Sequence, residues 1–172
     1  MNIFYLSHDP QESTQMLCDK HVVKMTLETT QIMLSIFHEH DWISVPCKRS
    51  HHNHPCCRWS RESLVNWAWL LEYGRSLACE YAFRYKKDHK CMEVMEWAAN
   101  RVDPALFLRS AGMTPPPLVI NSNLGVHPIL LELFKTDPVS AHREAYKLKV
   151  AAIDARWDNG RGKPAFLSMP KT

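Results

Sequence analysis

Apolar and small side chains recur every three or four positions in the first third of the chain, the spacing of a helix with one buried face. This stripe comprises Cys18, Val22, Met25, Thr29, Met33 and Ile36. The preceding Asp9-Pro10 is typical of a helix start, because aspartate caps the first turn and proline fits within it. The pattern predicts one helix from this start to about Phe37.

A second apolar stretch favours another long helix, from Pro55 to about Lys86, and it is rich in aromatic side chains. Within it, Gly74 indicates either a bend or a close contact with another helix. The rest of the chain predicts shorter helices separated by proline-marked connections. These are Cys91–Asn100, one or two turns after Asp103-Pro104, Pro128–Phe134, and Asp137-Pro138 to about Trp157.

The two ends of the chain are predicted to be non-helical. Asn2–Leu6 is a short apolar run, expected to be extended or a single strand packed on helices, because one strand cannot form a sheet alone. Residues 158–172 are expected to be a loose basic tail, with Phe166 docking back. The sequence therefore predicts an all-α fold over residues 1–172, a single-domain bundle of two long and several short helices with at most one short N-terminal strand.

Composition supports a folded, helical protein. Of the 172 residues, 45% are hydrophobic and 23% are charged, which excludes wholesale disorder. Five glycines against eleven prolines favour long helices over a turn-rich sheet protein. No apolar run approaches the roughly 18 residues of a membrane span, and the chain opens without signal-peptide features. We therefore expect a cytoplasmic protein with no membrane partner, whose six cysteines are reduced thiols.

The net charge of +3 is unevenly distributed. Residues 141–172 hold seven basic and three acidic side chains, with Tyr146, Trp157 and Phe166 among them. Cations interleaved with aromatic rings can hold a nucleic-acid backbone and stack its bases. A helix with a solvated basic face has the same composition, so both interpretations stay open.

The first candidate for chemistry is the segment CDKHVVKMTLE, residues 18–28. On a helix His21, Lys24 and Glu28 share one face at the border of the apolar stripe, where pKa values can be perturbed. Lysine can act as an amine nucleophile, and a carboxylate can shuttle protons or stabilise a sugar cation. The alternative is a solvated face with a Lys24–Glu28 pair. The candidate catalytic residues are Lys20, His21, Lys24 and Glu28.

The second candidate is the segment HPCCRWSRESLVNWAW, residues 54–69. Arg58, Glu62 and Asn66 fall on one helical face with Arg61 beside it, and arginine with tryptophan can hold a phosphate and stack a base. The alternative is a buried helix whose tryptophans belong to the core. The candidate substrate-binding residues here are His54, Trp59, Arg61, Glu62 and Asn66.

Histidines and cysteines form a third cluster, between Cys47 and Cys57. Zinc accepts both residue types, and Cys18 and His21 also have ligand spacing. The spacing matches no zinc pattern and contains no CxxC pair, so the prediction is a solvated histidine-rich loop. We expect neither a required metal nor a cofactor.

The combination of CDKHVVKM with HP…W…RES, and then EY..RY and DPV.A.REAY, resembles a family of small phage-type proteins over nearly the whole chain. The resemblance implies phage-type origin, host cytoplasm, and Arg84 as one more candidate substrate-binding residue. The shared positions are Asp19, Lys20, His21, Lys24, Glu28, His54, Trp59, Arg61, Glu62, Asn66, Tyr81, Arg84 and Tyr85.

A second resemblance points to chemistry. A first helix with a basic and acidic stripe, a long second helix and a C-terminal aromatic-basic segment are similar to the pyrimidine-dimer DNA glycosylases of the endonuclease V type. Those enzymes flip a base from DNA, attack the glycosidic carbon with an N-terminal amine exposed after methionine removal, and use a glutamate on the first helix. Here Asn2 is bulky and should hinder that removal. The nucleophile therefore stays open between the terminal amine, Lys20, Lys24 and water.

Two functions follow from the sequence. The first is an enzyme acting on a nucleic-acid base or nucleotide, most readily at an N-glycosidic bond, with Glu28 and Lys24 or Lys20 at the reacting atoms and Arg61 on phosphate. The second is a non-enzymatic phage protein that binds a host protein or nucleic acid. DNA, RNA and a free nucleotide all remain open as substrates.

Overall fold

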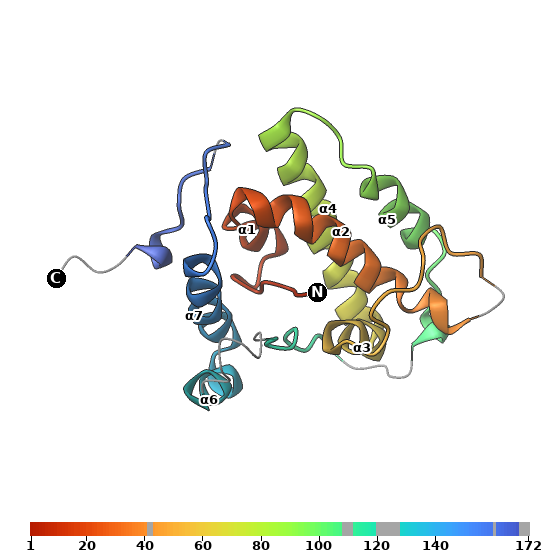
Figure 1. The fold of residues 1–172 in the computed structure, drawn as a ribbon. Coiled ribbons are helices and arrows are strands. Elements are labelled where there is room, and N and C mark those ends of the chain that lie inside the picture. Colours follow the sequence, from red (N-terminus) through yellow and green to blue (C-terminus); the bar gives the residue numbers. More distant parts are fainter. Residues whose placement is uncertain (41–42, 108–111, 120–127, 160, 169–172) are drawn as a thin grey trace.

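The computed structural model describes residues 1–40, 43–107, 112–119, 128–159 and 161–168, and within these ranges the fold is all-α, as predicted (Figure 1). No strand or sheet occurs in the described residues. The α-helices are α1 Pro10–Gln15, α2 Asp19–Leu34, α3 Pro55–Glu62, α4 Leu64–Tyr85, α5 Cys91–Ala99, α6 Pro128–Thr136 and α7 Pro138–Ala151. Short 3-10 turns are η1 Phe37–Glu39, η2 Pro104–Leu106 and η4 Ala165–Leu167.

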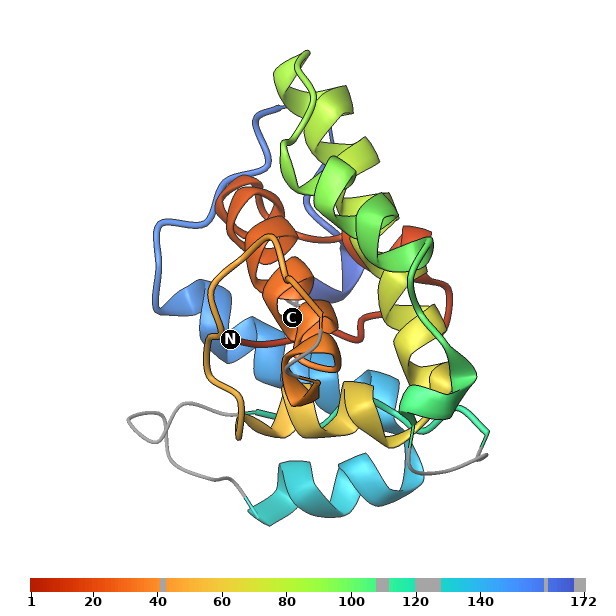
Figure 2. The same ribbon diagram turned by 90° about the vertical axis from the view of Figure 1, so that its right-hand side faces the viewer.

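The core lies where α2 crosses α4. Both helices contact α3 and α5, and α1 packs on α4; Figure 2 shows α5 lying along α4. Gly74 stands at this crossing, because a Cβ atom there would come within 2.5 Å of Met95 Sδ and 3.2 Å of Thr29 Cγ2. The close helix contact expected at Gly74 is confirmed. The indole of Trp67 is buried in the same core and donates to the carbonyl of Met33 at 3.0 Å.

The single helix predicted from Asp9 to Phe37 is wrong, because the chain breaks between α1 and α2. The break is stabilised by tertiary hydrogen bonds in place of helical ones. The guanidinium of Arg84 donates to the carbonyls of Gln15 and Leu17, and the amide of Cys18 donates to the Tyr146 hydroxyl at 2.9 Å. Buried polar groups at helix ends need such partners.

The second long helix is also divided, at Ser63. This residue is extended, with φ −148° and ψ 151°, and its side chain caps α4 by accepting from the amide of Asn66. The side chain of Asn66 then joins the break to residue 114: its Oδ1 accepts from the amide of Thr114 at 2.9 Å. Its Nδ2 donates to the carbonyl of Trp59 at 3.1 Å. The turn is therefore held by contacts both local and distant.

The N-terminal run is extended and buried, as expected, but it pairs with no strand in the described residues. Ile3–Leu6 lies between the α1–α4 layer and α7. Side chains supply the hydrogen-bond partners of its backbone. The amide of Leu6 donates to Ser13 Oγ, and the carbonyl of Leu6 accepts from the Nε of Arg143. The amide of Tyr5 donates to Nδ1 of His142 at 3.4 Å. The segment therefore joins α7 to the rest of the bundle.

Helix α7 ends at Ala151, earlier than the predicted Trp157, and α6 packs on it. The following segment crosses the α1–α2 break, where the indole of Trp157 donates to the carbonyl of Met16. Beyond it, the amides of Asp158 and Asn159 donate to the Asp19 carboxylate, so this part of the predicted loose tail is in contact with the bundle. In the described part of the chain no helix is long and apolar enough to cross a membrane.

Candidate active site

A pocket of about 260 Å³ opens between the N-terminal segment, α2 and α7. Figure 1 shows the N-terminus at this place, between the two helices. The walls come from Met1, Asn2 and Phe4, from His21, Lys24, Met25 and Glu28 of α2, from Leu118 and Val119, and from His142, Ala145 and Lys149 of α7. Three of the four predicted catalytic residues therefore share one pocket.

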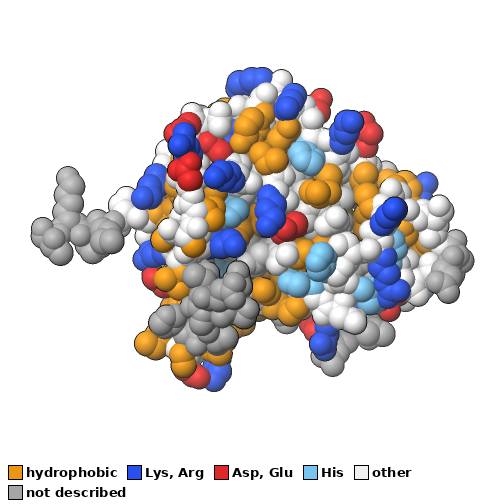
Figure 3. Space-filling view, viewed as in Figure 1, with side chains coloured by type: hydrophobic (Ala, Val, Ile, Leu, Met, Phe, Trp, Pro, Cys, Tyr) orange, Lys and Arg blue, Asp and Glu red, His pale blue; other side chains and the backbone are white. Residues whose placement is uncertain are grey.

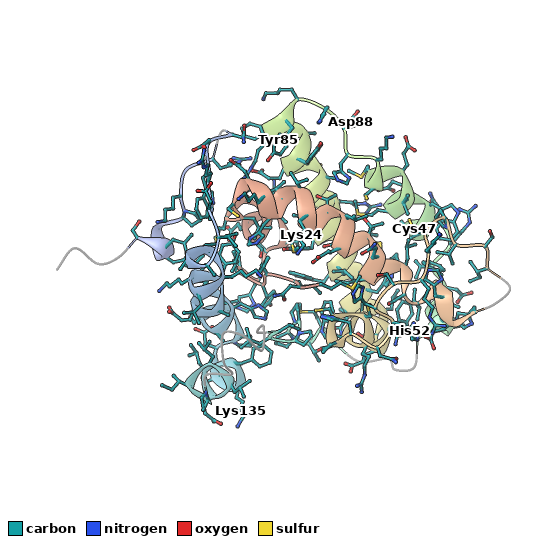
Figure 4. All side chains as sticks on the ribbon, in the orientation of Figure 1. Lys24, Cys47, His52, Tyr85, Asp88 and Lys135 are labelled. Carbon is teal, nitrogen blue, oxygen red and sulfur yellow. The ribbon has the colours of Figure 1, made fainter. Side chains whose placement is uncertain are left out.

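The carboxylate of Glu28 lies between two amines. Its Oε2 is 3.7 Å from the α-amine nitrogen of Met1, and its Oε1 is 3.3 Å from Nζ of Lys24. The Met1 side chain is only 2% exposed, whereas that of Lys24 is 63% exposed. The Met1 side chain is therefore sheltered although the residue as a whole is half-buried, and Lys24 lies at the rim of the pocket (Figure 4).

Asn2 fixes the start of the chain. Its Nδ2 donates to the carbonyl of Val119 at 3.1 Å, and its Oδ1 accepts from the amide of Ile3 at 2.8 Å. The sulfur of Met1 lies 4.0 Å from Sγ of Cys57 at the start of α3. These contacts orient the α-amine, because the groups on either side of it have defined partners.

His21 is buried beside this pair and is neutral at pH 7. Burial, aided by the cations of Lys149 and Lys24, lowers the pKa of His21 to about 4. Its Nδ1 lies 3.0 Å from the Tyr146 hydroxyl, which accepts from the amide of Cys18. We assign the Tyr146 O–H as donor to Nδ1, which leaves the ring proton of His21 on Nε2.

A second neutral histidine lies across the pocket on α7. Burial lowers the pKa of His142 to about 4, opposed by the hydrogen bond to the carbonyl of Pro116. Its Nε2 donates to that carbonyl at 3.1 Å, and its Nδ1 accepts from the amide of Tyr5. Both ring nitrogens are occupied, so His142 shapes the pocket and is not placed to move a proton.

His54 lies near the pair without lining the pocket. Burial lowers the pKa of His54, the terminal amine lowers it further, and the Glu28 carboxylate opposes this. Its Nδ1 caps α3 by accepting from the amide of Cys56. In the structure His54 is therefore the N-cap of α3, close to the N-terminal residue Met1.

The other predicted substrate-binding residues lie elsewhere. Arg61 donates to the carbonyl of His52 at 2.9 Å and pairs with Glu39. Figure 4 shows His52 well away from Lys24. The indole of Trp59 is buried and donates to the carbonyl of Thr114 at 3.0 Å. Glu62 is exposed on α3, Asn66 makes the buried contacts described above, and Lys20 is exposed on α2 without lining the pocket.

Arg84 is the centre of a buried ion network. Its guanidinium contacts Asp19 at 2.8 Å and Glu80 at 2.7 Å, and the arginine side chain is fully buried. Glu80 is also paired with Arg161 of the tail, at 3.0 Å. These partners of Arg84 are internal, so the structure uses it to join α4 to the α1–α2 break.

The pocket includes residues that the sequence analysis did not select. Lys149 and His142 come from α7, and Tyr146 stands behind His21. The basic and aromatic composition of residues 141–172 left two interpretations open, phosphate contact and a solvated basic face, and neither predicted that this helix would form a pocket wall. The geometry that brings α7 to α2 depends on the extended N-terminal run, whose sequence does not indicate which helices it contacts. In the described residues no group of three or more metal-ligating side chains could hold a metal ion.

An amine and a carboxylate held together in a small all-α protein define a site suited to amine-nucleophile chemistry. The family model for pyrimidine dimer DNA glycosylase matches residues 1–93, which is more than half of the chain. The chain therefore belongs to the pyrimidine dimer DNA glycosylase family, whose members act on DNA. Neither the curated proteins nor the solved structures contain a match. The likeness to small phage-type proteins rests on the motifs alone.

Proposed function

We propose that this protein is a DNA glycosylase that excises damaged pyrimidines, with the α-amine of Met1 as nucleophile and Glu28 as the catalytic carboxylate. The observation that carries the proposal is the 3.7 Å contact between these groups in a pocket lined by α2 and α7. The family match includes both residues.

The chemistry balances with the groups present. The neutral amine attacks C1′ of the damaged nucleotide, the new N–C1′ bond forms, and the base leaves with the electrons of the glycosidic bond. Glu28 accepts the proton that the nitrogen loses and passes it to O4′ as the sugar ring opens to a protonated imine. A carboxylate beside C1′ also stabilises the oxocarbenium-like charge of the transition state.

The neighbouring side chains bind and orient the substrate. Lys24 at the rim and Lys149 on α7 supply positive charge beside the pocket, where a DNA phosphate would lie. Figure 3 shows lysine and arginine side chains over the middle of this face and others spread toward its edges, where acidic side chains lie among them. Neutral His21 offers a hydrogen bond without adding a third cation beside the amine.

The Lys24 amine is the competing nucleophile, because it also contacts Glu28. Borohydride trapping decides between the two. The protein is incubated with a duplex containing one thymine dimer, reduced, digested and mapped by mass spectrometry. We expect the sugar adduct on the peptide that begins at Met1. An adduct on Lys24 would assign the nucleophile to that amine, and a cleaved glycosidic bond without an adduct would indicate water. The absence of both an adduct and a cleaved glycosidic bond would overturn the glycosylase function.

A further inference from the structure

The outward face of α2 combines two cations with two exposed aliphatic side chains. Val23 is 41% exposed and Leu27 is 48% exposed, and Lys24 and Lys20 stand on the same face. Residues three and four positions apart are neighbours on a helix surface, so the four side chains form one patch. None of the described α2 neighbours covers it.

The patch lies at the edge of the candidate active site. Successive residues on a helix are about 100° apart. Passing around α2 from the pocket wall, the order is Glu28, Lys24, Lys20, Leu27 and Val23. The aliphatic pair therefore lies just outside the lysines that border the pocket, within about two helical turns of the catalytic carboxylate.

We propose that Leu27, flanked by Val23, is a wedge that enters the DNA duplex where the nucleotide is extruded. This rests on the proposed function. A glycosidic bond inside a base stack cannot reach Glu28, so the nucleotide must leave the helix to enter the pocket. Extrusion leaves a gap between base steps, and aliphatic side chains fill such gaps in proteins that kink DNA.

Charge selects duplex DNA as the occupant of this face. Lys20 and Lys24 lie beside the aliphatic pair on its pocket side, and Lys149 stands across the pocket. The phosphate backbone of a duplex laid over this face would contact these cations, while an apolar protein partner would desolvate them. Phe83 on α4 is also an exposed apolar residue, but cations already contact its ring. The guanidinium of Arg161 lies 4.3 Å and Nζ of Lys86 lies 4.8 Å from the ring centroid.

The wedge is tested without any bond cleavage. The probe is a duplex with a stable tetrahydrofuran abasic site and 2-aminopurine as its neighbour, whose fluorescence rises when the base unstacks. Saturating wild-type protein should raise the fluorescence several-fold, and Leu27→Ala should remove most of that rise. Leu27→Met, which keeps the volume, should retain it. Val65→Ala on α4, at a comparably exposed aliphatic residue, is the matched control and should behave as wild type.

Cleavage of the thymine-dimer duplex is measured in parallel. Leu27→Ala should lower the single-turnover rate by about tenfold or more, because unstacking a base step is costly, with affinity for undamaged duplex within about threefold. Unchanged fluorescence and rate in Leu27→Ala would overturn the wedge and leave the proposed function standing. If unstacking depends on Leu27 but the wild-type protein cleaves no glycosidic bond, the glycosylase function is overturned and the contact with DNA stands.

Discussion

The α-amine nitrogen of Met1 lies 3.7 Å from Oε2 of Glu28, so the first residue of the chain meets the middle of α2. The contact depends on Asn2, whose side chain donates a hydrogen bond to the carbonyl of Val119, and on the buried segment Ile3–Leu6 that follows it. The endonuclease V-type enzymes that the sequence resembles use an amine and a glutamate in this way after losing the initiator methionine. In this structure the amine beside the glutamate is that of Met1.

Glu28→Gln should remove catalysis and leave binding. The amide keeps the shape of the side chain but cannot accept the proton of the nucleophile, and such losses cost a factor of about 10² to 10⁴ in rate. Single-turnover cleavage of the glycosidic bond and a filter-binding isotherm, both with the thymine-dimer duplex, measure the two effects. Glu144→Gln on α7, whose carboxylate pairs with Lys147, is the control. Wild-type turnover in Glu28→Gln would show that another group does the chemistry.

Asn2→Ala should move the nucleophile out of place. A small second residue permits removal of Met1, and the new α-amine would then start one residue later, about 3.8 Å along the chain. We expect loss of methionine by intact mass and a large loss of borohydride-trapped adduct. Asn2→Gln should keep Met1 and most of the adduct. Full trapping by an Asn2→Ala chain that has lost Met1 would contradict an amine fixed at the first residue.

The all-α class followed from apolar spacing and proline-marked starts, but the helix breaks did not. The break at Leu17 depends on Arg84, 67 residues away, and the adjoining Cys18 amide depends on Tyr146, 128 residues away. No local pattern contains such partners. The break at Ser63 did have a local signal, because serine three residues before Asn66 is a preferred helix cap.

Only part of the candidate site could be predicted, because local spacing contains no information on distant contacts. His21, Lys24 and Glu28 share a helical face, and periodicity alone brings them together. The second proposed set failed to join them in the pocket because Trp59, Asn66 and Arg84 have buried structural partners. Spacing along a helix reveals which residues share a face, and it cannot reveal which face another helix covers.

Arg84→Met should destabilise the fold strongly. The substitution removes a fully buried guanidinium and leaves the carboxylates of Asp19 and Glu80 without a shared counter-ion. Breaking a buried ion pair by removing one partner typically costs about 3–5 kcal/mol. Urea denaturation measures the free energy of unfolding. The matched control is Arg75→Met, where a half-exposed ion pair with Glu96 should be worth under about 1 kcal/mol. Equal losses of unfolding free energy in the two variants would mean that the buried network around Arg84 contributes no more to stability than a surface ion pair.

The free energy of unfolding should fall as the pH drops from about 6.5 toward about 4. The folded pKa values of His21 and His142 are lowered to about 4, so both rings stay neutral while the unfolded chain takes up protons below its ordinary value. The unfolded state therefore binds more protons in this window, at a cost of up to roughly 1.4 kcal/mol per pH unit for each ring. His142→Gln should reduce the slope of stability against pH. An identical slope would place the proton uptake on other groups.

The last prediction concerns salt, and it separates the cations beside the pocket from those of the tail. Arg161 is paired with the buried Glu80, whereas Lys149 and the more exposed Lys24, which is paired with Glu28, line the pocket where the phosphates of a bound duplex would lie. Each phosphate contact contributes about 0.9 to the log–log dependence of affinity on salt for duplex DNA. Lys24→Met and Lys149→Met should each lower that slope by about one contact, while Arg161→Met should leave it unchanged and lower stability instead. Fluorescence anisotropy with an undamaged duplex at several salt concentrations measures the slopes. The opposite result, a slope reduced only by Arg161→Met, would place the DNA along the C-terminal tail and away from α2.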